Sequence, residues 1–223
     1  MVNSAEEASE QILKLELRLA QLDRVEKCQG SFLDFVRAMW PEFITGKHHE
    51  IITEKLERVA KGELKRLIVN MPPRHTKSEF ASYLFPAWMI GRNPAMKIIQ
   101  ATHTTELAVG FGRKVKNLLE REDYQDIFSD SRLSVDSKAS GRWDTARGGM
   151  YYAVGVGSNL AGRGGDLIVI DDPHSEQTAM SSHGFEDAWD WYTGGPRQRL
   201  QPGGAIVLVM TRWSEKDLTG QLI

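Results

Sequence analysis

Apolar residues near the start of the chain recur at alternating spacings of three and four positions, as they do on one face of a helix. They are Ala5, Ala8, Ile12, Leu15, Leu19 and Leu22. An apolar helical face needs a partner surface, and we expect this helix to dock on the rest of the chain. A coiled coil is the alternative, but the pattern falls short of the three to four heptads that would favour it. Residues 1–28 are therefore predicted to form an N-terminal helix that packs on, or extends from, a domain comprising residues 29–223.

Beyond this helix the pattern changes repeatedly between a helical period and the short continuous runs typical of buried strands. Helices are predicted over Phe32–Met39, His49–Ala60, the residues after Lys77, Thr105–Leu119 and Glu186–Tyr192, and strands over Arg66–Met71, Lys97–Thr102, Leu133–Asp136, Met150–Val156, Leu167–Ile170 and Ala205–Met210. A last helix is expected to open at Ser214, with Asp217 completing a capping box. This alternation predicts an α/β fold, in which a mainly parallel sheet is flanked by helices. Ligands of such sheets bind beyond the carboxyl ends of the strands.

The composition is that of an ordinary globular domain, with 41% hydrophobic and 26% charged residues in 223. The formal net charge of -2 creates no overall basic field, so any contact with nucleic acid has to come from a local patch. The single cysteine, Cys28, cannot form an internal disulfide, and the Glu-rich start differs from a signal peptide. No apolar run approaches the roughly 20 residues that span a bilayer. We therefore expect a soluble protein of a reducing compartment.

A candidate phosphate-binding loop follows the strand that ends at Met71. The loop reads Pro72-Pro73-Arg74-His75-Thr76-Lys77-Ser78, and a helix-like stretch comes next. Backbone N–H groups and the helix dipole attract phosphate at such a turn. Lys77 is predicted to reach the β- and γ-phosphates of a triphosphate, and Ser78 to ligate Mg²⁺. Met71 and Thr76 stand where the G-x-x-x-x-G-K-[ST] pattern has glycines, so a proline-stiffened turn with an exposed Lys and Ser is the alternative.

A second candidate motif is the apolar run Leu167–Ile170, which ends in Asp171 and Asp172. A buried strand of this kind delivers carboxylates to the carboxyl edge of the sheet. Asp171 is predicted to hold Mg²⁺ through its water shell, and Asp172 to polarise the attacking water. A simple Asp-Pro turn at Asp172-Pro173 is the alternative. Because both motifs occur in one chain with a strand between them, we interpret the pair as an ATPase site.

These residues resemble the large-subunit family of tailed-bacteriophage terminases, in which a Pro-Pro-Arg-His-x-Lys-Ser loop replaces the glycine-rich form and the acidic strand commonly ends in Asp-Asp-Pro. Other segments match the family's pattern in the family's order: His48-His49, Gly62-Glu63-Leu64-Lys65-Arg66, Gly162-Arg163-Gly164-Gly165-Asp166, Thr211-Arg212-Trp213 and Asp217-Leu218-Thr219-Gly220. The resemblance covers residues 32–223 and implies a P-loop NTPase of the additional-strand (ASCE) type, with ATP and Mg²⁺ as cofactors.

The resemblance also implies a biological setting. Members of the family work as a homo-oligomeric ring, usually a pentamer, that pumps double-stranded DNA through a portal into a procapsid. A small terminase subunit is a further expected partner, no membrane is involved, and the location is the host bacterial cytoplasm during virus assembly. The nuclease domain that follows in the family is absent from this chain, so we expect no DNA cleavage from it.

Roles for individual residues follow from the resemblance. Nucleotide binding is expected from Pro73, Arg74, His75, Thr76, Lys77 and Ser78, with His49 as a candidate adenine contact. The expected catalytic residues are Asp172, Lys77, Arg74 and Arg163. Of these, Arg74 would sense the γ-phosphate in its own subunit, and Arg163 would enter the neighbouring site as an arginine finger. Thr211 is the expected coupling residue that transmits hydrolysis to movement.

Thr76 stands where many family members carry glycine, and a Cβ there costs roughly 1–2 kcal/mol if the position needs a positive φ, which would weaken nucleotide binding. Lys138 and Arg142 form a basic pair between two weak strands, and we expect DNA contact there because loops on a rigid scaffold often carry function. Such phosphate contacts would be salt-dependent and sequence-blind.

Two other functions compete with a packaging motor. A helicase-like remodeller would need a second motor-like half, which this chain does not contain. A non-hydrolysing DNA-binding or scaffold module with a decayed phosphate loop is the other alternative, and it predicts no nucleotide turnover.

Overall fold

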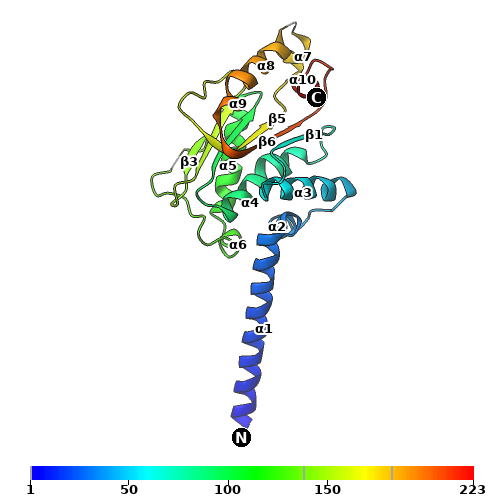
Figure 1. The fold of residues 1–223 in the computed structure, drawn as a ribbon. Helices are drawn as coiled ribbons and strands as arrows, with labels where there is room; N and C mark the ends of the chain where they lie inside the picture. The colour runs from blue at the N-terminus through cyan, green and yellow to red at the C-terminus, as the bar shows by residue number, and fades with distance from the viewer. Residues whose placement is uncertain (1, 138, 182) are drawn as a thin grey trace.

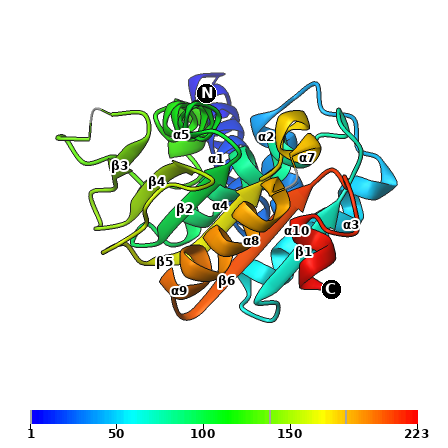
Figure 2. The same ribbon diagram turned by 90° about the horizontal axis from the view of Figure 1, so that it is seen from above.

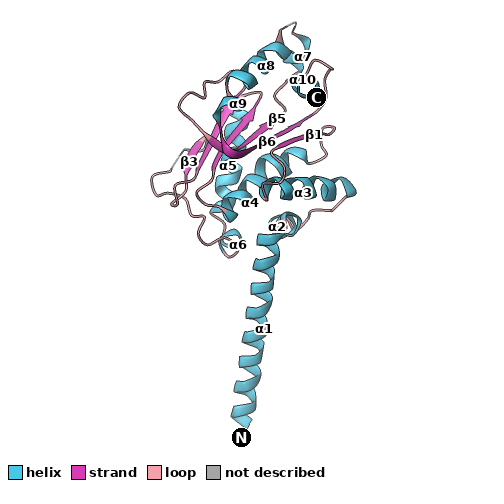
Figure 3. Ribbon diagram, in the orientation of Figure 1, coloured by secondary structure: helices cyan, strands magenta, loops and turns pink. Residues whose placement is uncertain are grey.

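A computed structural model describes residues 2–137, 139–181 and 183–223, which form a six-stranded sheet with helices on both sides (Figures 1 and 3). In spatial order the strands are β1 (Arg66–Asn70), β6 (Leu200–Met210), β5 (Gly165–Asp171), β2 (Lys97–Thr102), β4 (Met150–Gly155) and β3 (Arg142–Asp144). The first five are parallel, and β3 is antiparallel to β4. The predicted α/β class with a mainly parallel sheet is confirmed. Strand β6 lies between β1 and β5, so the strands that carry the two motifs are not neighbours.

Two groups of helices cover the two faces of the sheet (Figure 2). One group comprises α2 (Phe32–Met39), α3 (Lys47–Ala60), the π-helix η1 (Glu79–Leu84), α4 (Phe85–Arg92) and α5 (Thr105–Leu119), with the short α6 (Glu122–Gln125) after it. The other comprises α7 (Glu176–Met180), α8 (Gly184–Gly194), α9 (Pro196–Arg199) and α10 (Leu218–Leu222). A sheet covered on both faces explains why its strands read as continuous apolar runs.

Strand β5 shows how the period-2 geometry of a strand builds two cores. Leu167 and Val169 belong to the cluster on the α2–α5 side, whereas Ile168 and Ile170 belong to the cluster that contains Trp191 of α8. The four β5 side chains are at most 1% exposed. Burial of both faces fixes the register of β5, because a slip of one residue would exchange the two sets of side chains. The acidic residues at its end are therefore held at a defined place on the sheet edge.

Helix α1 (Val2–Gly30) projects away from the domain (Figure 1). The apolar face predicted from the sequence is solvent-exposed, with exposed fractions of 57% for Ile12, 64% for Leu15, 65% for Leu19 and 50% for Leu22. Its last turn is anchored, because Trp88 Nε1 donates a hydrogen bond of 2.8 Å to the carbonyl of Cys28. The expectation that this helix docks on the domain is wrong in this structure, and the helix extends instead. The spacing of the apolar residues predicts an apolar face on the helix, but it does not predict whether another surface covers that face.

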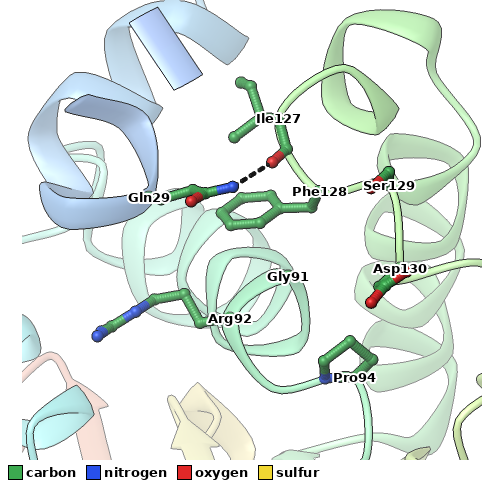
Figure 4. A pocket seen from close by; sticks show the side chains of 8 residues that line it. All are labelled: Gln29, Gly91, Arg92, Pro94, Ile127, Phe128, Ser129 and Asp130. Atoms are coloured by element: carbon green, nitrogen blue, oxygen red, sulfur yellow. Dashed lines mark hydrogen bonds between the residues drawn. The ribbon is translucent and has the colours of Figure 1, made fainter. Parts of the chain in front are cut away.

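A cavity of about 360 Å³ lies where α1 joins the domain, between α4 and the segment after α6 (Figure 4). Gln29 closes one side of it by donating a hydrogen bond of 2.6 Å to the carbonyl of Ile127. The side chains of Phe128, Arg92 and Asp130 also line it. None of the residues predicted to bind nucleotide or metal lines this cavity.

Three local predictions differ from the structure. The residues Leu133–Asp136 do not form a strand; Leu133 makes an isolated bridge to Thr145, and the edge strand is β3. The last helix starts at Leu218 rather than at Ser214, because the Asp217 side chain caps it by accepting a hydrogen bond of 2.9 Å from the N–H of Gly220. The helix after Lys77 begins as a π-helix before it continues as α4. Within the described part of the chain, no helix is both long and apolar enough to cross a bilayer.

Candidate functional site

The candidate phosphate loop connects β1 to η1 and turns through two left-handed residues. Arg74 has φ 63° and Thr76 has φ 61°. This conformation is uncommon for residues with a Cβ and most unfavourable for a β-branched one. The loop then enters η1, where the N–H of Phe80 donates a hydrogen bond of 3.0 Å to the carbonyl of Thr76. The turn carries Lys77 inward, where it is 6% exposed.

The acidic pair lies at the carboxyl edge of the sheet, as predicted. Asp171 is the last residue of β5 and is 2% exposed. Asp172 follows with φ 41°, and its N–H donates a hydrogen bond of 2.9 Å to the carbonyl of Val209 on β6. This bond fixes the backbone at the point where the strand leaves the sheet.

The structure brings the loop and the acidic pair into direct contact. Lys77 Nζ lies 2.8 Å from Asp172 Oδ2, and Ser78 Oγ donates a hydrogen bond of 3.0 Å to Asp171 Oδ1. The side chain of Lys77 is 7% exposed and that of Asp172 is 30% exposed, so the ammonium is nearly removed from water. A charge buried to this degree needs a close partner. The four residues assigned to the two motifs thus meet at one edge of the sheet.

Asp171 is held in a buried polar network that the sequence analysis did not identify. Ser82 Oγ donates a hydrogen bond of 2.7 Å to Asp171 Oδ2 and accepts one of 3.1 Å from Gln100 Nε2. Burial raises the pKa of Asp171 to about 6; the nearby carboxylate of Asp172 also raises it, while the hydroxyls of Ser82 and Ser78 lower it. Two signals were present in the sequence: a serine four residues after Ser78, and a glutamine inside the apolar run of β2.

Thr211 lies directly after β6, between the loop and the acidic pair. Its N–H donates a hydrogen bond of 2.8 Å to Asp172 Oδ1, and its hydroxyl donates one of 3.3 Å to the carbonyl of Met71. The residues that follow are tied to Asp217, whose Oδ2 accepts hydrogen bonds of 2.9 Å from Arg212 Nε and from the N–H of Trp213. The segment from Thr211 to Trp213 therefore contacts both predicted motifs and the cap of α10.

His49 lies beside the loop, but its described contacts are with protein. Its ring is 6% exposed and packs between Phe43 and Phe80, with centroid distances of 4.7 and 5.1 Å. Nδ1 accepts a hydrogen bond of 2.9 Å from the N–H of Gly46, and Nε2 lies 2.7 Å from Thr76 Oγ1. Burial lowers the pKa of His49, which favours the neutral ring. An adenine contact by His49 stays a prediction, since both ring nitrogens already have partners.

The predicted arginines lie at different places. Arg74 is exposed in the loop. Arg163 precedes β5, which is about 20 Å long, so it lies at the opposite end of this strand from Asp171. Its guanidinium stacks 3.8 Å from the centroid of the Tyr152 ring. Arg163 is therefore not part of the site formed by its own chain.

The predicted DNA-binding pair is only partly covered by the structure. Arg142 is exposed, but it begins edge strand β3 rather than lying in a loop, because it pairs with Tyr152 on β4. The expectation of a loop at this position is wrong. Lys138 lies outside the described residues.

A cavity of about 630 Å³ opens beside Asp172, between the segments that follow β5, β2 and β6. Its lining includes Pro73, His103, Asp172, His174, Thr211 and Trp213. His103 Nδ1 donates a hydrogen bond of 3.2 Å to the carbonyl of Asp172. Polar side chains and an aromatic ring thus surround an open space next to the exposed part of this carboxylate.

The side chains at this edge suit a metal-bound triphosphate. Mg²⁺ takes oxygen ligands and usually binds one or two carboxylates while phosphates and water complete its shell. Ser78 and Asp171 supply a hydroxyl and a carboxylate in contact with each other, and Lys77 supplies the positive charge for phosphate. Within the described ranges, no group of three or more His, Cys, Asp or Glu side chains forms a metal site by itself.

Comparison with known proteins reveals similarity in fold. No protein-family model matches the sequence, and no curated protein matches it. Among solved structures, the chain is similar to one described as the crystal structure of the HK97 bacteriophage large terminase, with a TM-score of 0.55 and 12% sequence identity. The match covers 82% of this chain and 37% of that chain. At this identity the likeness establishes a shared terminase-like fold, and this chain spans little more than a third of the neighbour's length.

Proposed function

We propose that this chain is the ATP-hydrolysing motor domain of a viral genome-packaging machine. The observation that carries the proposal is the meeting of Lys77, Ser78, Asp171 and Asp172 at the carboxyl edge of a parallel sheet. The position of β6 between β1 and β5 supports a P-loop NTPase of the additional-strand type. The fold shared with a bacteriophage large terminase supports packaging as the setting.

Each of the four residues would have a defined part in hydrolysis. Lys77 would leave Asp172 and bind the β- and γ-phosphate oxygens, while Ser78 and Asp171 would hold Mg²⁺. The metal, when bound, neutralises charge that develops on the phosphates. Asp172 Oδ2, freed from Lys77, would accept a hydrogen bond from the attacking water and orient it toward the γ-phosphate. The open cavity beside Asp172 gives water access to this carboxylate.

The contact between Asp172 and Thr211 suggests how hydrolysis would be coupled to movement. Because the N–H of Thr211 donates to Asp172 Oδ1, a displacement of this carboxylate changes the support of the segment from Thr211 to Trp213. That segment is tied to the cap of α10 through Asp217. Thr211 is therefore the residue through which we expect a change at the nucleotide to reach the surface of the domain.

If Arg163 acts as an arginine finger, it acts on a neighbouring subunit. It lies at the opposite end of β5 from Asp171, so within one chain it is remote from the proposed site. A homo-oligomeric ring would bring Arg163 of one subunit to the site of the next. Double-stranded DNA, the portal of a procapsid and a small terminase subunit are the proposed partners, with Arg142 and Lys138 as proposed DNA contacts, and the host bacterial cytoplasm is the proposed location.

Nucleotide binding and turnover test the proposal directly. Calorimetry with Mg·ATP is expected to show binding to the unsubstituted chain and at least about tenfold weaker binding to Lys77→Ala, because a charge-assisted contact with phosphate is worth 1.5–3 kcal/mol. Lys61→Ala, which removes the exposed lysine at the C-cap of α3, is the control and should bind normally. Steady-state ATPase activity with DNA and procapsids should vanish in Lys77→Ala and Asp171→Ala. Binding without turnover under these conditions would instead favour a non-hydrolysing module.

Mixing of inactive variants tests the action of Arg163 on a neighbour. Arg163→Ala and Asp171→Ala should each be inactive alone, and a mixture of the two should recover part of the activity. Recovery is expected because one kind of subunit keeps the intact site and the other keeps the intact finger. A mixture that stays inactive would refute the proposal that Arg163 acts on a neighbouring subunit. It would not contradict the proposed ATPase site.

A further inference from the structure

The phosphate loop contains a residue in a conformation that its side chain opposes. Thr76 has φ 61°, and a left-handed β-branched residue costs roughly 1–2 kcal/mol relative to glycine. Thr76 directly precedes Lys77, so its backbone conformation sets where the lysine leaves the loop. Strain of this kind persists only when surrounding contacts hold the residue in place. We therefore expect the contacts of the Thr76 side chain to supply that support.

The hydrogen bonds of Thr76 and His49 have one consistent assignment. Thr76 Oγ1 donates its single proton to the carbonyl of His75 at 2.6 Å. It must then accept at its other contact, so His49 Nε2 carries the hydrogen and donates across 2.7 Å. This agrees with Nδ1 of the same ring, which accepts from the N–H of Gly46 at 2.9 Å. The neutral Nε2–H form of His49 satisfies every one of these bonds.

His49 is held rigidly enough to act as a support. Its ring is 6% exposed and lies between the rings of Phe43 and Phe80, stacked on the latter at an interplanar angle of 16°. Phe80 belongs to η1, the helix that the loop enters, and Gly46 is the N-cap of α3. The Nε2 donor of His49 is thus fixed by packing against the two phenylalanine rings and by the hydrogen bond from Gly46 at the start of α3.

We propose that His49 is a positioning residue that holds Thr76 in the left-handed conformation and so presets the loop for a triphosphate. The inference rests on the proposed function and goes beyond it, because it gives His49 a role through Thr76 instead of a contact with the base. The chain would in this way keep a threonine at a position where glycine needs no support. The need for His49 should therefore depend on which residue occupies position 76.

A double-substitution cycle on Mg·ATP affinity measures that dependence. His49→Ala is expected to weaken binding about tenfold in the otherwise unsubstituted chain and less than about twofold in a Thr76→Gly background. His49→Gln, whose amide N–H can replace the Nε2 donor, should recover most of the affinity. His48→Ala is the matched control: His48 is exposed, and its ring lies 3.8 Å from that of His49 at an interplanar angle of 46° and 6.0 Å from that of His75. It makes no described hydrogen bond to Thr76, so its effect should be the same in both backgrounds.

A second variant separates the hydrogen bond from general packing around His49. Thr76→Val keeps the branched side chain and removes only the hydroxyl, so it should weaken binding as much as His49→Ala, and the two together should weaken it no further. Circular dichroism establishes that each variant is folded before it is titrated.

The outcomes distinguish this inference from the proposed function. Equal losses from His49→Ala in the two backgrounds, or normal binding by Thr76→Val, would overturn the positioning role while leaving nucleotide binding intact. If the folded, unsubstituted chain bound no Mg·ATP at all, the proposed function would fail and the positioning role with it. A strong dependence on position 76 supports both.

Discussion

Ser82→Ala is the most informative single change at the acidic strand, because it removes one hydroxyl from a fully buried network. Ser82 is 0% exposed, donates to Asp171 Oδ2 and accepts from Gln100 Nε2. The alanine would leave the carboxylate oxygen without this donor and the amide without this acceptor. The variant changes no residue that we assign to contact with nucleotide, so its effect reports on the network itself.

The expected loss depends on pH, since Asp171 titrates near pH 6 in the folded chain. A hydrogen bond to a charged group contributes about 1.5–3 kcal/mol and a neutral one about 0.5–1.5 kcal/mol. The pKa of Asp171 is raised to about 6, so the carboxylate is charged at about pH 8 and mostly protonated at about pH 5. We expect Ser82→Ala to lower the free energy of unfolding by roughly 2–3 kcal/mol at the higher pH and roughly 1 kcal/mol at the lower.

The sign follows from linkage between protonation and folding. A carboxyl whose pKa is raised on folding stabilises the fold fully below its unfolded pKa, and this stability is lost as pH rises through the folded pKa. Because the Ser82 hydroxyl lowers the pKa of Asp171, its removal raises that pKa further. A difference of about 1.4 kcal/mol between the two conditions corresponds to a further rise of about one pKa unit.

Urea unfolding followed by tryptophan fluorescence at the two pH values measures these losses. Ser131→Ala is the matched control: Ser131 is also 0% exposed, but its hydroxyl bonds the carbonyl of Phe128 and the hydroxyl of Tyr124, and burial keeps the pKa of Tyr124 above its ordinary value. Its loss should be the same at both pH values. Equal losses for Ser82→Ala at the two pH values would refute the account of the network.

Two further predictions concern other parts of the chain. Deletion of residues 1–22 should change the free energy of unfolding by less than about 0.5 kcal/mol, because Ile12, Leu15, Leu19 and Leu22 are at least half exposed; a loss above about 1 kcal/mol in urea unfolding would contradict the exposed helix. His174 is 2% exposed, and its Nε2 accepts a hydrogen bond of 2.9 Å from the N–H of Leu218. Burial lowers the pKa of His174; the carboxylates of Asp217 and Asp172 raise it, but the effect of burial is larger. Its contribution to stability is therefore complete above pH 6.5 and is lost as pH falls, so the unsubstituted chain should lose more stability than His174→Gln between about pH 7.5 and about pH 5.5; parallel curves would contradict this.

Local patterns were sufficient to predict the five parallel strands of the sheet and the places of the two motifs, but not the edge strand β3. Continuous apolar runs such as Leu167–Ile170 arise because a parallel strand is buried on both faces. Such a run can be recognised from the residues of one segment without knowledge of its partners. The chain direction then places Asp171 at a strand end and Lys77 at a helix start. Since all ligand-binding ends of a parallel sheet lie on one edge, their proximity was also predictable, and Lys77 Nζ lies 2.8 Å from Asp172 Oδ2.

Contacts between segments remote in the sequence were not predictable in the same way. The exposure of α1 was missed because an apolar stripe has the same period whether or not a partner surface is present. Ser82 and Gln100 were missed because a buried serine in a helix and a glutamine in a strand have no pattern of their own; they gain a role only when η1 and β2 lie beside Asp171.

The period of each segment, the direction of the strands and the chemical groups at their ends were readable from the amino-acid sequence, because they depend on neighbours within a few residues. The three-dimensional structure was needed to show that β6 separates β1 from β5, that the apolar face of α1 is exposed, and that His49 Nε2 lies 2.7 Å from Thr76 Oγ1. These features depend on packing between segments that can lie more than a hundred residues apart in the sequence. The free energy of such packing is a property of the assembled core rather than of any one segment.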